Sequence, residues 1–231
     1  MKKLTFLLLS AASILTLSFT GTNVTEFEGK ITYEITVEGG DMPPGAMAMF
    51  SGSELTVHMK GVKSRSDMSM GMQNTTTISD IKTGTSVILM DMMGNKYKIK
   101  SDPAKDEKAP NMEVKYLNDT KIIAGYKCKR ADVTLRDEKE NQMVSRTVWY
   151  TEDISNHMVN NPRHSDFKGI KGMPLEYEMA AGQGIKMKMT AKTVSKESVP
   201  DSKFDIPEGY KETTMEDMEK DMMKMMQGGQ H

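Results

Sequence analysis

Methionine side chains are the most unusual chemical feature of this sequence. The chain holds 24 methionines in 231 residues, with only six phenylalanines and one tryptophan. Side chains two residues apart on a β-strand point to the same side, so Met68, Met70 and Met72 form one predicted row and Met187 with Met189 forms another. Thioether sulfur is a soft ligand that prefers Cu(I), and flexible thioether side chains also adapt to varied apolar ligands.

Three interpretations of these methionine rows stay open. The residues can be plain core, since thioethers fill irregular gaps. They can line a cavity for a lipid, an acyl chain or another apolar ligand, or they can bind Cu(I) through Met68, Met70 and Met72. The residues predicted to line a ligand cavity are Met47, Met49, Phe50, Met68, Met70, Met72, Met187 and Met189.

Motifs for catalysis or for zinc binding are not found in the sequence. The four histidines, His58, His157, His164 and His231, do not have the spacing of a zinc pair. Neither a Gly-x-Ser-x-Gly elbow nor a glycine-rich phosphate loop is present. The single cysteine, Cys128, stands in a strand-like segment and is predicted to be a buried, inert thiol. We therefore expect no enzymatic activity, no catalytic residues and no cofactor.

Alternation of apolar and polar residues with a period of two predicts the elements that position these side chains. Within residues 30–38, Ile31, Tyr33, Ile35 and Val37 share one side, and charged or polar residues share the other. Short strands with one apolar face and glycine-rich turns between them predict a mainly β, antiparallel sheet folded as a sandwich or an open barrel. It should have nine to eleven strands, each buried on one face and solvent-exposed on the other. The other predicted strands are residues 54–60, 63–70, 74–80, 86–91, 96–100, 112–117, 126–136, 143–151, 175–179 and 185–192.

Two segments break this alternation. Residues 42–50 carry two prolines followed by apolar residues, which predicts a short helix or cap. Residues 213–227 predict an amphipathic helix with a capping box of Thr213 and Glu216 and a favourable pair of Glu216 with Lys220. Its methionine stripe can belong to a core, a lid, a docking face for an envelope protein partner, or a sulfur site completed by His231. The stripe consists of Met215, Met218, Met222 and Met225.

The N-terminus has the layout of a secretory signal peptide. Lys2 and Lys3 precede an apolar stretch from Leu4 to Phe19, and polar residues follow. This stretch is shorter than the roughly 20 residues of a membrane span. We therefore expect residues 1–22 to be removed and the rest to be a soluble periplasmic protein, not an integral membrane protein. With 31 basic against 32 acidic residues, nucleic acid is not an expected partner.

Five short segments occur in a characteristic order: residues 27–33 (FEGKITY), 123–129 (IAGYKCK), 148–153 (VWYTED), 169–177 (GIKGMPLEY) and 204–211 (FDIPEGYK). In this order they resemble a family of exported bacterial proteins known only as a domain of unknown function (DUF4412), which is grouped with the LolA-like lipoprotein carriers. The resemblance implies a curved, antiparallel, open half-barrel over residues 24–212, with short plugging helices. Residues 213–231 would follow as a Met-rich helix and tail. In the carriers, the concave side shelters acyl chains.

These observations together predict a periplasmic protein that binds or carries a hydrophobic ligand in a methionine-lined concavity. One alternative is a periplasmic Cu(I)-binding protein that uses the methionine rows. Another is an envelope scaffold or stress protein without a small ligand, which contacts its partner through helix 213–227.

Overall fold

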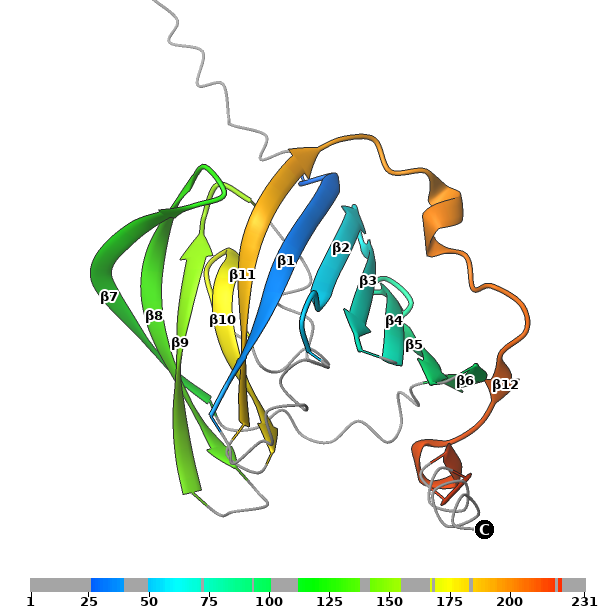
Figure 1. The fold of residues 1–231 in the computed structure, drawn as a ribbon. Coiled ribbons are helices and arrows are strands. Elements are labelled where there is room, and N and C mark those ends of the chain that lie inside the picture. Colours follow the sequence, from blue (N-terminus) through cyan, green and yellow to red (C-terminus); the bar gives the residue numbers. More distant parts are fainter. Residues whose placement is uncertain are drawn as a thin grey trace, which may run out of the picture.

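The described residues form an antiparallel meander of eleven strands, with a short twelfth strand at one edge (Figure 1). The structure is a computed structural model, and it describes residues 26–39, 50–71, 73–92, 94–100, 112–137, 142–154, 167, 169–182, 185–218 and 220–221. The strands are β1 (Gly29–Glu38), β2 (Glu54–Lys60), β3 (Lys63–Met70), β4 (Gln73–Asp80), β5 (Thr85–Met92), β6 (Asn95–Lys100), β7 (Met112–Ile123), β8 (Tyr126–Asp137), β9 (Gln142–Thr151), β10 (Met173–Gly182), β11 (Ile185–Lys196) and β12 (Lys211–Glu212).

All strands belong to one open sheet. Their order is β12-β6-β5-β4-β3-β2-β1-β11-β10-β9-β8-β7, and every pair is antiparallel except β12 with β6. The first strand lies in the middle because β1 pairs with both β2 and β11. This arrangement leaves β7 and β12 as the two edges. The mainly β, antiparallel, open architecture confirms the predicted fold class.

The sheet curls around the face that carries the predicted apolar rows. Phe167, which lies between β9 and β10, packs edge-on against Tyr177 of β10 with ring centroids 4.7 Å apart. Two residues later, the carbonyl of Gly169 accepts a hydrogen bond from the hydroxyl of Tyr116 on β7. Strands three places apart in a flat sheet would be about 14 Å apart. This segment contacts both strands, and β7 also approaches β11, four places away in the sheet, because the sheet is curved (Figure 1). We call this hollow side the inner face.

The inner face carries the main hydrophobic core. Ile31, Tyr33 and Ile35 are buried, as the alternation in residues 30–38 predicts. The hydroxyl of Tyr33 donates a hydrogen bond of 2.9 Å to the carbonyl of Pro174, so its buried polar atom is satisfied. Its ring stands edge-on to Tyr177, with centroids 6.0 Å apart. These contacts join β1 in the centre of the sheet to β10.

The predicted strands are all present, although several are longer than predicted: β10 spans residues 173–182 instead of 175–179, and β11 ends at Lys196 instead of residue 192. β7 continues to Ile123, beyond the predicted end at residue 117, because an irregularity between Tyr116 and Thr120 interrupts the alternation without ending the pairing with β8. β12 was not predicted, since two residues are too few to show any period.

The outer face of the sheet is not uniformly exposed to solvent, so the prediction of one fully solvent-exposed face is wrong. After β11 the chain crosses the outer face through the 3₁₀ turn η4 (Asp201–Phe204). Lys60 donates a hydrogen bond of 3.0 Å to the carbonyl of Val199, and Arg65 donates one of 3.2 Å to the carbonyl of Lys203. A second core forms beneath this segment from Ile78, Val87, Leu89, Val199 and Phe204.

The C-terminal helix begins one residue later than its predicted capping box. The hydroxyl of Thr214 accepts a hydrogen bond of 3.1 Å from the backbone N–H of Asp217, which makes Thr214 the N-cap. The backbone N–H of Thr213 donates instead to the carbonyl of Lys98, at 3.0 Å. The predicted box of Thr213 and Glu216 is therefore wrong, because residue 213 is held by β6.

Other predictions for the termini are partly tested. Glu216 and Lys220 form the predicted ion pair at 2.6 Å, and residues 215–218 and 220–221 are helical. The remainder of helix 213–227, the signal peptide at 1–22 and the plug at 42–49 lie outside the described residues. None of the helices among the described residues combines the length and the apolar character that a membrane-spanning helix requires.

Candidate ligand-binding face

A row of paired residues crosses the inner face from β1 to β6. Tyr33 lies opposite Leu55, Leu55 opposite Met68, and Met68 opposite Thr75. The row continues from Thr75 to Met90 and from Met90 to Tyr97. Paired residues of antiparallel strands point to the same face. Met68 and Met90 therefore share the inner face, separated by Thr75 on β4.

Two further methionine groups flank this row. On one side, Met70 lies opposite Gln73, and Gln73 lies opposite Met92. Toward the other end of the sheet, Met187 lies opposite both Val37 and Met179. Together these side chains form what we call the methionine wall, and each of them is half-buried. The methionine wall consists of Met68, Met70, Met90, Met92, Met179 and Met187.

Charge is absent from the inner face of strands β1–β6. Because side chains alternate, the register places every charged residue and histidine of these six strands on the outer face. The inner face of β3–β5 also carries hydroxyls, such as those of Ser79 and Ser86, which hydrogen-bond to each other at 3.0 Å. The charged residues and the histidine that point outward on these strands are Lys30, Glu34, Glu38, Glu54, His58, Lys60, Lys63, Arg65, Asp67, Asp80, Asp91, Lys96, Lys98 and Lys100.

The structure divides the predicted ligand-lining residues. Met68, Met70 and Met187 are half-buried and pack against the main core while keeping part of their surface accessible. Met189 is fully buried, so it belongs to the core and a ligand cannot reach it. Phe50 is half-buried in the turn before β2, where its carbonyl accepts a hydrogen bond from Ser53. Met47, Met49 and Met72 lie outside the described residues.

Sequence reasoning missed three members of the methionine wall. Met90 and Met92 stand two residues apart in the apolar run of β5, the same signal that identified Met68 and Met70. Met179 was assigned to the apolar side of its strand but not to a ligand surface. Its pairing with Met187 required the register of β10 against β11, which no local pattern specifies.

Two hollows of the described surface lie at the edge of the sheet, away from most of the methionine wall. Their volumes are about 580 and 530 Å³, and Lys211 and Asp221 line both. These two side chains form an ion pair of 2.8 Å. Charged and polar residues line the first hollow, whereas the second also includes two glycines and the ring of Tyr97, an inner-face residue of β6. They are surface grooves around the C-terminal segment.

Burial shifts the pKa values of Cys128 and His58. Burial raises the pKa of the Cys128 thiol to about 11, so it is protonated at neutral pH, as the prediction of an inert thiol requires. Burial, followed by the charge of Lys203, lowers the pKa of His58 and keeps it neutral near pH 7. Its Nδ1 lies 4.0 Å from Asp67, which Arg65 and Thr76 already engage. Within the described residues, no group of three His, Cys, Asp or Glu side chains is placed to hold a metal ion.

A family model described as a domain of unknown function (DUF4412) matches residues 27–210. The match begins just before β1 and ends just before β12, so it spans both cores of the sheet. No curated protein matches the chain.

Proposed function

Because the chain belongs to the DUF4412 family, whose description assigns no activity, we propose a function from the geometry of the inner face. The protein binds an apolar ligand, such as the acyl chain of a lipid, against the methionine wall. The observation that carries this proposal is a set of half-buried methionines on the hollow side of the sheet, where strands β1–β6 present no charge. A ligand that covers these side chains removes their remaining apolar surface from water.

The chemistry of the wall favours an apolar chain of variable shape. Unbranched thioether side chains have three rotatable bonds and repack around different ligands at low cost. A charged group pressed against this wall would lose its hydration without gaining a counter-ion. The chain of an amphiphile would therefore lie along the methionines, and any charged head group would remain at the rim.

The proposal includes an exported, non-enzymatic binding or carrier role. The layout of residues 1–22 supports export, and a carrier needs no catalytic group. N-terminal sequencing of the protein recovered from the periplasm tests the location. We expect the mature chain to begin between residues 20 and 23.

Ligand binding is tested first on natively purified protein. Lipids are extracted and identified by mass spectrometry, and the delipidated protein is titrated with Nile red and then with monopalmitoylglycerol as a competitor. We expect co-purified lipid and competitive displacement of the dye. A protein that is reproducibly empty and ignores both added compounds contradicts the proposal.

A matched pair of variants locates the binding site on the wall. Met68→Gln combined with Met90→Gln keeps the side-chain volume but makes the inner face polar. We expect affinity for monopalmitoylglycerol to fall about ten-fold or more, since two side chains lose favourable apolar burial. Met143→Gln is the control, because Met143 is 62 % exposed on β9. Equal affinities for the two variants would place the ligand elsewhere.

Leucine substitutions distinguish the Cu(I) alternative. Met68→Leu, Met70→Leu and Met72→Leu together remove three sulfur atoms but leave the surface apolar. We expect this triple variant to retain binding of monopalmitoylglycerol. A protein that binds Cu(I) under reducing conditions, loses the metal in this variant and never binds lipid would instead be a copper-binding protein.

A further inference from the structure

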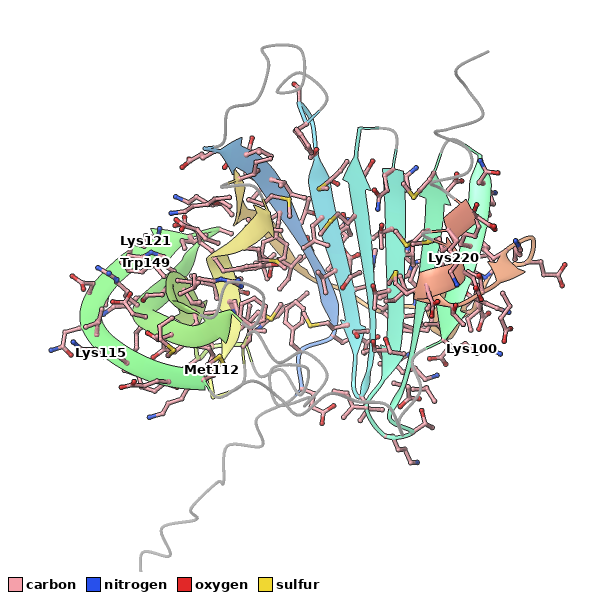
Figure 2. All side chains as sticks on the ribbon, turned by 90° about the horizontal axis from the view of Figure 1, so that it is seen from below. Lys100, Met112, Lys115, Lys121, Trp149 and Lys220 are labelled. Atoms are coloured by element: carbon pink, nitrogen blue, oxygen red, sulfur yellow. The ribbon has the colours of Figure 1, made fainter. Side chains whose placement is uncertain are left out.

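The inner face is covered at one end by the protein's own C-terminal helix. Met218 is 4 % exposed and forms a buried cluster with Tyr97 and Ile99 of β6. Ile88 and Met90 of β5 pack around this cluster and are themselves half-buried. Figure 2 shows the helix, marked by Lys220, in front of β5 and β6. The helix therefore occupies surface continuous with the methionine wall, because Met90 belongs to both.

The C-terminal segment reaches this position by passing around the edge of the sheet. Phe204 packs on the outer face, and β12 then pairs in parallel with β6. The Thr213 N–H donates to the carbonyl of Lys98, and the helix follows on the inner face. The family match ends at residue 210, so β12 and the helix lie beyond the matched residues.

Among the described helical residues, 215–218 and 220–221, few contacts hold the helix on the sheet. Met218 is the buried side chain among the described helical residues, whereas Met215 is 44 % exposed. The ion pairs around the helix include Lys98 and Lys100 with Glu212, at 3.0 and 3.1 Å, and Lys211 with Asp221 at 2.8 Å. Each pair has at least one side chain that is more than half exposed, and such pairs contribute little to stability. A segment attached in this way can be displaced without unfolding the sheet.

We infer that the inner surface of Tyr97 and Ile99 is a second subsite for the apolar chain of the ligand, and that Met218 fills it until a ligand displaces the helix. This inference rests on the proposed function, which it extends to the β5–β6 end of the sheet. The unbranched side chain of Met218 offers the same contacts as a short piece of an acyl chain. A ligand lying along the row from Met68 to Met90 meets Tyr97 next, because Met90 and Tyr97 are directly paired.

Two serine variants in one helical turn test the subsite. Met218→Ser removes the apolar group that fills it, whereas Met215→Ser makes the same change at a solvated position. A site that is mostly closed lowers the apparent affinity by the fraction of molecules that are open. We expect Met218→Ser to bind monopalmitoylglycerol about ten-fold more tightly than the wild type. Met215→Ser should stay within about two-fold of the wild type.

Hydrogen exchange followed by mass spectrometry gives a readout that does not depend on affinity. In the wild type, the amides of Thr213 and Met218 are hydrogen-bonded to Lys98 and Thr214. We expect saturating monopalmitoylglycerol to accelerate exchange in residues 213–218. Binding with unchanged or slower exchange there, or equal affinities for both serine variants and the wild type, overturns the subsite and leaves the proposed function standing. No binding by any of the three proteins overturns both.

Discussion

The buried thiol of Cys128 makes the stability of the protein sensitive to alkaline pH. Its side chain is fully buried, and burial raises its pKa from an ordinary value of 9.0 to about 11. The unfolded chain therefore releases this proton at a lower pH than the folded chain does. The resulting stability is fully present below pH 9 and is lost as the pH rises toward 11. The difference in pKa corresponds to a total of about 2 to 3 kcal/mol, of which about 1 kcal/mol is lost between pH 9 and 10.

Urea unfolding of the wild type and of Cys128→Ala at pH 7, 9 and 10 measures this effect. We expect the alanine variant to be less stable at pH 7, because it leaves a small cavity. Its free energy of unfolding should then fall by about 1 kcal/mol less than that of the wild type between pH 9 and 10. Burial also raises the pKa of Tyr33, but its contribution is lost mainly above pH 10 in both proteins. Parallel pH profiles for the two proteins would refute the account of Cys128.

Two further predictions concern the fold. Phe204→Ala should destabilise the protein by about 3 kcal/mol in urea unfolding, because Phe204 is 8 % exposed in the second core on the outer face. Ile206→Ala is the control and should change the free energy of unfolding by less than about 0.5 kcal/mol, since Ile206 is 44 % exposed. Equal effects of these two substitutions would mean that the outer segment is not docked. Gly172→Ala should lower the free energy of unfolding by about 3 kcal/mol or more, because a Cβ would lie 2.1 Å from the carbonyl oxygen of Thr151. Near-normal stability of that variant would contradict this close approach.

Most of the sheet could be predicted from residue alternation because each strand buries one face. In β1, Ile31, Tyr33 and Ile35 are buried as expected, and β3 has the predicted bounds, residues 63–70. Local patterns could not supply the order of strands. The pairing of β1 with β11 joins residues far apart in the sequence, and the register irregularity between Thr32 and Tyr33 leaves no local signature.

The methionine wall was predicted only in part for the same reason. Spacing of two residues places Met68 with Met70 correctly, because they share one strand. Alternation also suggested that Met187 and Met189 line one surface, yet Met189 is fully buried whereas Met187 is half-buried. The difference depends on depth within the curved sheet. Curvature is a property of the whole sheet, and it cannot be predicted from two residues of one strand.

The sequence of β5 indicates that a segment covers the outer face, although the alternation of apolar and polar residues in the other strands does not. Val87, Ile88, Leu89 and Met90 form a continuous apolar run, which is typical of a strand that is buried on both faces. Its outward members pack against the segment after β11, and its inward members lie beside Met218. A chain that covers both faces of the same strand must pass around the sheet edge next to it, and β12 on β6 provides that passage. The two-faced run therefore predicts a covering segment, although only the structure identifies it as the C-terminal one, whose inner part lies where an apolar ligand would extend.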